Sequence, residues 1–233
     1  MKFIIGTKIT NLGMKYKIIR DKNKLNSFIE TLPDLYSGET YFIRLITRSK
    51  YVKSISVDTD IRFLTTNKEN IIQSIKQLEC EIGSYYGLNE NEIGVYLSPN
   101  PRSQSKVIKN MFLLSNNVIG NYRGQDPIAM LSHVYRTTNS RHIYYDIDFD
   151  GCDVEDTLIK VKTFINKDCV RILHTKGGIH LIIKYGDIDV KKHPNWFNNI
   201  ISLPHYDSLC MLDNNIPIPG CSQFGFIPYF TDL

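Results

Sequence analysis

The stretch Ile143-Tyr144-Tyr145-Asp146-Ile147-Asp148-Phe149-Asp150 alternates between apolar and polar side chains. Alternation with a period of two is typical of a β-strand that buries one face. One face would carry Ile143, Tyr145, Ile147 and Phe149, and the other Tyr144, Asp146, Asp148 and Asp150. Residues two apart lie about 6.6 to 6.8 Å apart along a strand. We therefore expect the carboxylates of Asp146 and Asp148 to converge above one face.

Two carboxylates held close together repel each other, and a cation relieves that repulsion. Their hard oxygen ligands suit Mg²⁺ or Mn²⁺, and a pair of such ions assists phosphoryl transfer. The alternative for this segment is an exposed acidic face that ends a strand and caps a helix. A second Asp-x-Asp, Asp58-Thr59-Asp60, lacks the long alternating frame, and we expect it to lie in an exposed turn.

The surrounding pattern predicts an α/β fold with helices packed on a sheet. Asp153 is placed to cap a helix over 154–166, and strands are expected at 170–174 and 179–185. Upstream, the expected strands are 2–9, 41–47 and 93–98, and the expected helices are 22–32, 67–85 (capped by Asn67), 103–114 and 127–136. We expect one domain over 1–233, with an N-terminal subdomain over about 1–92 and a motif-bearing core over about 93–233.

A glycine turn, Thr175-Lys176-Gly177-Gly178-Ile179-His180, joins the last two strands. Adjacent glycines permit a tight reversal and a close approach of the backbone to a ligand. Beyond the turn, His180 and Lys184 share a strand face, where a cation and a hydrogen-bond donor would suit a triphosphate. The alternative is a structural hairpin with a half-buried histidine.

The amino-acid composition narrows the class of protein to which the chain can belong. The 233 residues are 42% hydrophobic and 22% charged, with a formal net charge of +4, which permits a polyanionic partner without requiring one. No apolar run approaches the roughly 20 residues of a membrane span, and the N-terminus lacks a signal peptide, so we expect a cytoplasmic protein with no membrane partner. Five scattered cysteines without a C-x-x-C pair predict reduced core thiols.

The order of these segments resembles the archaeo-eukaryotic primase superfamily, including the primase-polymerases of plasmids and phages. Asp146-Ile147-Asp148 is similar to its acidic motif, and the turn ending in His180 is similar to its second motif, with Thr175 in place of the usual Ser. Tyr206-Asp207 or Leu212-Asp213 is similar to its third, acidic motif. Pro219-Gly220 and Asn100-Pro101-Arg102 resemble flanking segments of that family.

The resemblance covers about residues 93–230 and implies an RNA-recognition-motif-like sheet joined to an N-terminal α/β subdomain. It implies that Asp146, Asp148 and either Asp207 or Asp213 hold two Mg²⁺ or Mn²⁺ ions. His180 would contact the phosphates of the incoming nucleotide, and Thr175, Lys176, Gly177, Gly178 and Lys184 would complete the nucleotide site.

The sequence thus predicts a DNA primase or primase-polymerase, a nucleotidyltransferase that joins nucleoside triphosphates on a single-stranded DNA template. Arg102, Lys106 and Lys109 are candidates for contacts to template phosphates, unless they form an ordinary solvated basic face. A separate helicase or replication protein would supply any further replication function. The alternatives are a metal-dependent nuclease and a non-catalytic relative that binds nucleic acid or a replication partner.

Overall fold

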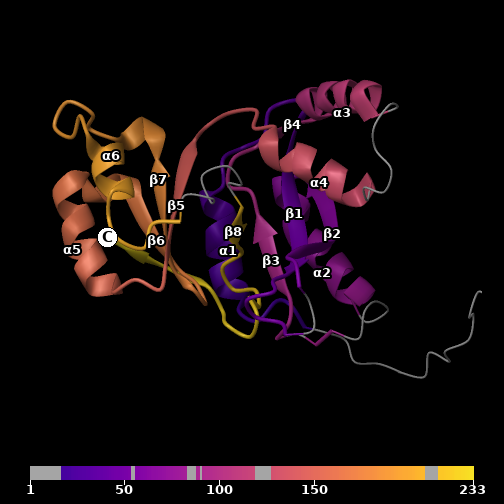
Figure 1. Cartoon of the computed structure of the whole chain (residues 1–233), viewed down its shortest axis with the longest axis horizontal. Helices are drawn as coiled ribbons and strands as arrows, with labels where there is room; N and C mark the ends of the chain where they lie inside the picture. Colours follow the sequence, from indigo (N-terminus) through magenta and orange to yellow (C-terminus); the bar gives the residue numbers. More distant parts are fainter. Residues whose placement is uncertain (1–16, 54–55, 83–87, 90, 119–126, 208–214) are drawn as a thin grey trace, which may run out of the picture.

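The computed structural model describes residues 17–53, 56–82, 88–89, 91–118, 127–207 and 215–233. These residues form two antiparallel sheets, each with helices packed on it, which lie side by side in Figure 1. The α/β class predicted from the sequence is confirmed in this general form, as a mixed α and β architecture.

The first sheet is built around β1 (Glu39–Thr47), which is buried along almost its whole length. The strand order is β2–β1–β3–β8, with β2 at Thr59–Thr66, β3 at Gly94–Leu97 and β8 at Ile216–Pro217, while the short β4 (Arg102–Ser103) also pairs with β1. The helices of this part are α1 (Lys22–Thr31), α2 (Ile71–Ile82), α3 (Gln104–Val118) and α4 (Pro127–Thr137). Tyr41, Ile43 and Leu45 join the core formed with α1 and α2. Phe42, on the other face, stacks on Tyr135 of α4.

The second sheet has the order β5–β7–β6–β9. Its strands are β5 (Tyr144–Asp150), β6 (Val170–His174), β7 (Gly178–Lys184) and β9 (Tyr229–Asp232), and its helices are α5 (Val154–Phe164) and α6 (Trp196–Ile201). Ile147 and Phe149 of β5 pack with Leu181 of β7, Val161 of α5 and Trp196 of α6 in one apolar core. The predicted apolar face of the acidic strand is therefore the face that the helices cover.

The opposite face of the second sheet turns toward the first sheet. Ile182 of β7 and Leu173 of β6 point to that side and belong to the same core cluster as α1, α2 and β1. The chain also crosses between the two sheets near its end, because β8 lies in the first sheet and β9 in the second. Both sheets thus share part of their interior, and a polar group next to Ile182 on this face lies between them.

Asn100 fastens the acidic strand to the first sheet. Its side chain is fully buried, its Oδ1 accepts hydrogen bonds from the backbone N–H groups of Ile143 and Tyr144, and its Nδ2 donates to the carbonyl of Tyr144. A buried amide that satisfies three backbone bonds of another element fixes the position of that element. Asn100 therefore sets where β5 begins.

The order of elements around the second sheet is strand, helix, strand, strand, helix and a final extended segment. In that segment Tyr206 forms an antiparallel bridge with Phe149 on the free edge of β5. The spatial order is thus the 205–207 segment, β5, β7 and β6, with β9 added at the far edge. The order along the chain is thus β-α-β-β-α, followed by an extended segment that is bridged to the first of these strands.

Most expected elements are present within a few residues of the expected ends. Asn67 and Asp153 act as predicted caps, with their side chains accepting hydrogen bonds from the backbone N–H groups of Asn70 and Asp156. The expected strand at 2–9 lies outside the described residues. The division expected near residue 92 does not match the two sheets, because β3 pairs with β1 in the first sheet.

The expectation for Asp58-Thr59-Asp60 is wrong for its second acid. Asp58 is exposed, as expected, but Asp60 lies in β2, where the Arg44 guanidinium contacts it at 2.6 Å and the hydroxyl of Ser132 donates to it. Pairing of β2 with β1 creates this buried ion pair, and local sequence carries no sign of it.

The expectations for the cysteines and for a membrane-spanning helix can be compared with the structure over the described residues. Cys169 and Cys221 are buried free thiols, and Cys152 is a partly exposed one, in agreement with the predicted reduced core thiols. Nor does any helix in this part of the chain combine the length and hydropathy that a bilayer crossing requires.

Asp60→Ala should destabilise the fold strongly, because it leaves the buried Arg44 guanidinium without its carboxylate. Breaking such a pair costs about 3–5 kcal/mol in the free energy of unfolding. Urea denaturation followed by circular dichroism measures this loss, and Asp58→Ala, at an exposed site, should change stability by no more than about 0.5 kcal/mol. Equal effects of the two variants would show that the Arg44–Asp60 pair has no structural role.

Candidate functional site

Asp146 and Asp148 lie on the face of β5 that turns toward the first sheet. Each is only 4% exposed, although both are acids two residues apart on one strand. The sequence pattern predicted their common face, but it did not predict their burial. Carboxylates this deeply buried require a compensating charge or hydrogen bond.

That compensation comes from His180 on the neighbouring strand. β5 and β7 pair in a register that sets Asp148 directly opposite His180. The imidazole Nδ1 lies 2.7 Å from Oδ1 of Asp146, and Nε2 lies 3.5 Å from Oδ1 of Asp148. The ring thus stands between two carboxylates and contacts one through each nitrogen.

The position of the ring controls its charge. Burial acts to lower the pKa of His180, but the carboxylates of Asp148 and Asp146 outweigh that effect and raise the pKa to about 9. At neutral pH the ring is therefore an imidazolium that donates a hydrogen bond to Asp146. The cluster holds two negative charges and one positive charge in a buried space.

A third acid approaches Asp148 from the other edge of β5. The backbone N–H of Asp207 donates to the carbonyl of Asp148 at 2.9 Å, and Tyr206 bridges Phe149. In an antiparallel register this places Asp207 beside Asp148 on the same face of the sheet, opposite His180. Asp213, the other candidate for the third acid, lies outside the described residues.

The glycines of the Thr175–Gly178 turn allow a close approach to β5 itself. A Cβ added to Gly178 would lie 1.9 Å from the carbonyl oxygen of Phe149, and one added to Gly177 would lie 2.3 Å from Oδ1 of Asp150. The Thr175 backbone N–H closes the turn on the Gly178 carbonyl at 2.9 Å. The contact that requires glycine is thus with the neighbouring strand, whereas the sequence suggested contact with a ligand.

The two lysines expected to bind nucleotide have different surroundings. The backbone N–H of Lys176 donates to Oε1 of Gln223, and its ammonium donates to the carbonyl of Phe224. Lys184 pairs with Asp187 at 2.7 Å, four residues beyond His180 and hence about 13 Å along the strand. The structure therefore brings Lys176 to the turn but does not bring Lys184 to the imidazole.

The basic residues expected to contact a template also differ in their surroundings, since one of them is buried and two are exposed. The expectation for Arg102 is wrong, because its side chain is completely buried and donates to Asn139 and to the carbonyl of Arg136. A side chain in the interior cannot reach a phosphate on the surface. Lys106 is exposed and donates to the carbonyl of Asn139, and Lys109 is also exposed.

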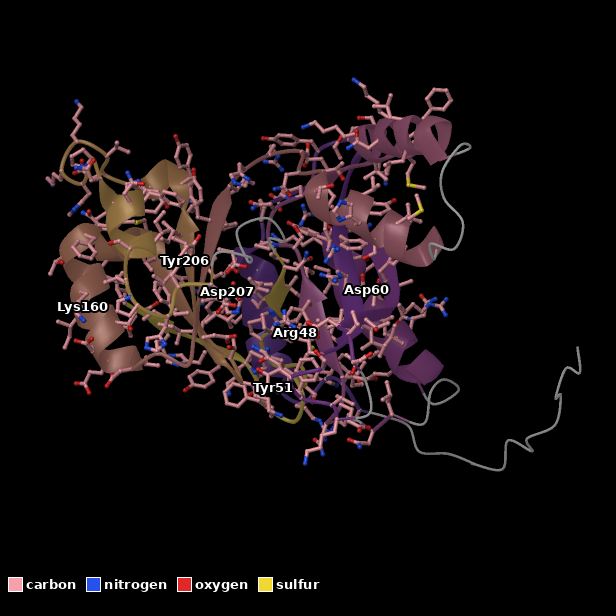
Figure 2. All side chains as sticks on the ribbon, in the orientation of Figure 1. Arg48, Tyr51, Asp60, Lys160, Tyr206 and Asp207 are labelled. Carbon is pink, nitrogen blue, oxygen red and sulfur yellow. The ribbon has the colours of Figure 1, made fainter. Side chains whose placement is uncertain are left out.

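Sequence reasoning missed a group of residues from the first sheet that faces the acidic cluster. Arg48, Lys50 and Tyr51 follow directly after β1, and the Lys50 ammonium lies 2.6 Å from Oδ2 of Asp150 at the end of β5. The first sheet with its helices is here called the first lobe, and the second sheet with its helices the second lobe. Figure 2 places Arg48 and Tyr51 in the part of the first lobe nearest the second sheet, with Asp207 across from them. The only local signal was a basic and aromatic run at the end of an apolar strand.

The carboxylates of Asp146 and Asp148 are ligands of the type that a divalent cation such as Mg²⁺ or Mn²⁺ prefers. In the conformation described, however, the imidazole fills the space between the carboxylates of Asp146 and Asp148. Across the described ranges, no three His, Cys, Asp or Glu side chains are grouped so that they could hold a metal ion. An ion at the acid pair would therefore have to displace His180.

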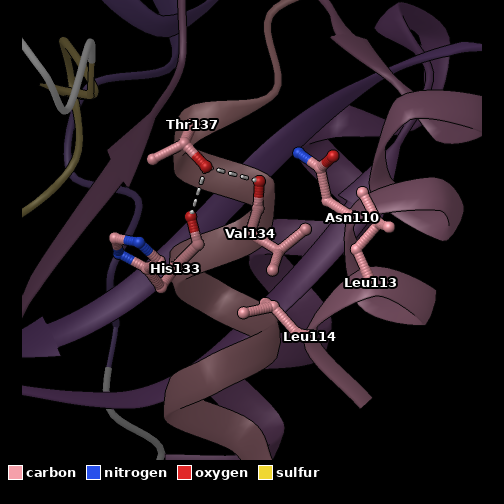
Figure 3. Close-up of a pocket in the computed structure, with 6 residues that line it drawn as sticks. All are labelled: Asn110, Leu113, Leu114, His133, Val134 and Thr137. Carbon is pink, nitrogen blue, oxygen red and sulfur yellow. Dashed lines mark hydrogen bonds between the residues drawn. The ribbon is translucent and has the colours of Figure 1, made fainter. Parts of the chain in front are cut away.

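A separate pocket lies between α3 and α4 (Figure 3) and contains no acidic group. Its lining residues are Asn110, Leu113, Leu114, His133, Val134 and Thr137. The Thr137 hydroxyl is engaged with the carbonyls of His133 and Val134 in its own helix. The cluster around His180 is a stronger candidate site than this pocket, because it joins two buried acids with a charged imidazole.

Comparison of the chain with models of protein families, with curated proteins and with solved structures gives no match. The case for a function therefore comes from the geometry of the chain's own residues.

The imidazole of His180 should titrate with a pKa near 9 in the metal-free protein, well above the usual 6.5. Histidine-selective NMR in the presence of a chelator measures this value. His174 provides an internal control, because burial lowers its pKa below the usual value. A His180 pKa at or below 6.5 would contradict the contact with the two carboxylates.

Stability should follow the same titration. A pKa raised in the folded state stabilises the protein fully below pH 6.5, and this contribution is lost as the pH rises toward 9. The full difference is roughly 3 kcal/mol. Urea unfolding at pH 6 and pH 9.5 measures it, and the pH-dependent part should disappear in His180→Gln. An unchanged pH dependence in that variant would assign the effect to other groups.

Proposed function

We propose that this protein is a nucleotidyltransferase of the primase and primase-polymerase type, which joins nucleoside triphosphates on a single-stranded nucleic acid template. One observation carries the proposal: Asp146 and Asp148 of one strand meet His180 of the paired strand on the face that turns toward the first lobe. Acids with an adjacent imidazole donor can serve transfer of a nucleotidyl group to a hydroxyl, through charge stabilisation and hydrogen bonding.

The arrangement of the second sheet supports the same proposal. The strand order β5–β7–β6–β9 is consistent with the expected RNA-recognition-motif-like sheet, with the acid pair on β5 and the histidine on the neighbouring β7. Asp207, whose backbone N–H donates to the carbonyl of Asp148, is the third acid in this proposal. The sheet face that such domains leave free of helices is here the face that carries the polar cluster.

Each residue has a distinct part in the proposed reaction. Asp146 and Asp148, with Asp207, would hold Mg²⁺ or Mn²⁺, which when bound stabilises charge on the attacking and leaving oxygens. His180, freed from the carboxylates, would donate hydrogen bonds to the nucleotide's phosphates. Lys176 would add a positive charge at the turn, while exposed Lys106 and Lys109 remain candidates for template phosphates.

The direct test is nucleotide incorporation by the purified chain with Mn²⁺, a single-stranded template and labelled nucleotides, with and without a primer. Asp146→Asn and Asp148→Asn should each lower incorporation by at least about a hundredfold, since removal of one charge-stabilising group costs that much. Asp168→Asn, an equal change at an exposed residue on the surface, should leave incorporation unchanged. Chelation should abolish activity in every variant.

The same assay separates the competing functions. Shortening of the template without incorporation, lost in Asp148→Asn, would favour a metal-dependent nuclease. Template binding with neither reaction would favour a non-catalytic nucleic-acid-binding protein. Incorporation that survives both asparagine substitutions would contradict the assignment of the acid pair.

His180→Gln should weaken the use of nucleotide more than the binding of template, because the proposed contact is to phosphate. The expected result is a rise of about tenfold or more in the KM for nucleotide, with template affinity within about twofold of the parent. Steady-state kinetics and fluorescence anisotropy with labelled DNA measure the two quantities. Equal losses of both would return His180 to a structural role.

A further inference from the structure

The turn that follows β1 extends from the first lobe toward the end of β5. Its backbone is fixed by hydrogen bonds from the N–H groups of Tyr51 and Val52 to the carbonyl of Arg48, and Val52 is only 2% exposed. Arg48 and Lys50 extend from this anchored turn. The turn is therefore a firm support for two cationic side chains.

Two ammonium groups, one from each lobe, lie against the ring of Tyr51. The Lys50 ammonium is 5.2 Å from the ring centroid, and that of Lys176, from the glycine turn, is 4.7 Å from it. The ring also packs against Phe224, at 4.6 Å between centroids. Tyr51 thus holds two positive charges close together at the junction of the sheets.

Arg48 continues this line of positive charge toward the acid pair. Its guanidinium lies 5.2 Å from the ring centroid of Tyr96, whose hydroxyl accepts from the Gln223 amide. Gln223 in turn accepts from the backbone of Lys176. Arg48 is also close enough to His180 for its charge to act against protonation of the imidazole. Arg48, Lys50 and Lys176 therefore form one group, which is connected through Tyr51, Tyr96 and Gln223.

We propose that Arg48, Lys50 and Lys176 form a polyphosphate-binding site that spans both lobes. In the proposed reaction this site would bind the triphosphate of the incoming nucleotide. The assignment to a nucleotide rests on the proposed function. The guanidinium offers paired donors to phosphate oxygens and the ammonium groups offer compact charges. Lys50 and Lys176 are exposed, and Arg48 is partly exposed, so a ligand can reach the two ammonium groups and part of the guanidinium.

The charge of the group favours a polyphosphate over a nucleic acid backbone. Three cations held within one small region match an anion that concentrates three or four charges, whereas a phosphodiester carries one charge per nucleotide. Ion pairs with exposed carboxylates can be exchanged readily, and one of them joins Arg48 to Asp58 at 3.9 Å, where the Asp58 side chain is 57% exposed. The Lys50–Asp150 pair has both side chains 40% exposed, and ion pairs of that exposure contribute little to stability. Lys176 donates to a single backbone carbonyl.

Inorganic tripolyphosphate provides a probe that needs no template and no turnover. Titration calorimetry of the full chain should detect its binding, and Arg48→Gln, Lys50→Gln and Lys176→Gln should each raise the Kd by about tenfold. Lys160→Gln is the matched control, because Lys160 lies on α5, behind the second sheet (Figure 2), and pairs with Asp156. Its Kd should equal that of the parent. Thermal unfolding of each variant confirms that it is folded.

The results separate this inference from the proposed function. Weaker tripolyphosphate binding in the three variants, in a protein that incorporates no nucleotide, supports the site and contradicts the nucleotidyltransferase. Incorporation with an unchanged KM for nucleotide in Arg48→Gln and Lys50→Gln supports the enzyme and overturns the site. Folded variants that keep the parent affinity for tripolyphosphate, or that lose affinity only for single-stranded DNA, overturn it as well.

Discussion

The contact of one imidazole with two buried carboxylates is the interaction on which the site depends. It exists only because β5 and β7 pair in the register that sets Asp148 opposite His180. A shift of one residue would turn His180 to the face covered by α5 and α6 and bury it among apolar side chains. The apolar residues Ile147, Phe149 and Leu181 on that face therefore fix the register as firmly as the charges do.

The candidate site also depends on the first lobe, which covers the charged face of the second sheet. Asn100 fixes the start of β5, and the turn at 48–51 brings cations to its end. In this partly closed space the charges of Asp146, Asp148 and His180 are screened less than they would be on an open surface. A ligand that enters must therefore replace these contacts with equally strong ones, which a metal-bound polyphosphate can do.

The sequence predicted what depends on local periodicity. The alternation in 143–150 and 179–184 correctly placed Asp146 and Asp148 on one face and His180 on the matching face of its partner strand. Local sequence patterns failed to predict the surroundings of side chains that segments distant in the sequence bury. Arg102 is buried because Arg136 and Asn139 supply its acceptors, and Asp60 is largely shielded because β2 pairs beside Arg44. Arg48 and Lys50 reach the site only through the packing of the two lobes, which no local pattern records.

The most direct measurement is the anomalous diffraction of crystals soaked in Mn²⁺ and a non-hydrolysable nucleoside triphosphate. The account predicts a manganese peak at coordination distance from the carboxylates of Asp146 and Asp148, with the imidazole of His180 moved from between them toward the phosphates. A cluster that keeps its His180 contacts at saturating Mn²⁺, with no manganese peak beside either acid, would contradict the account and leave the three residues as a structural charge cluster.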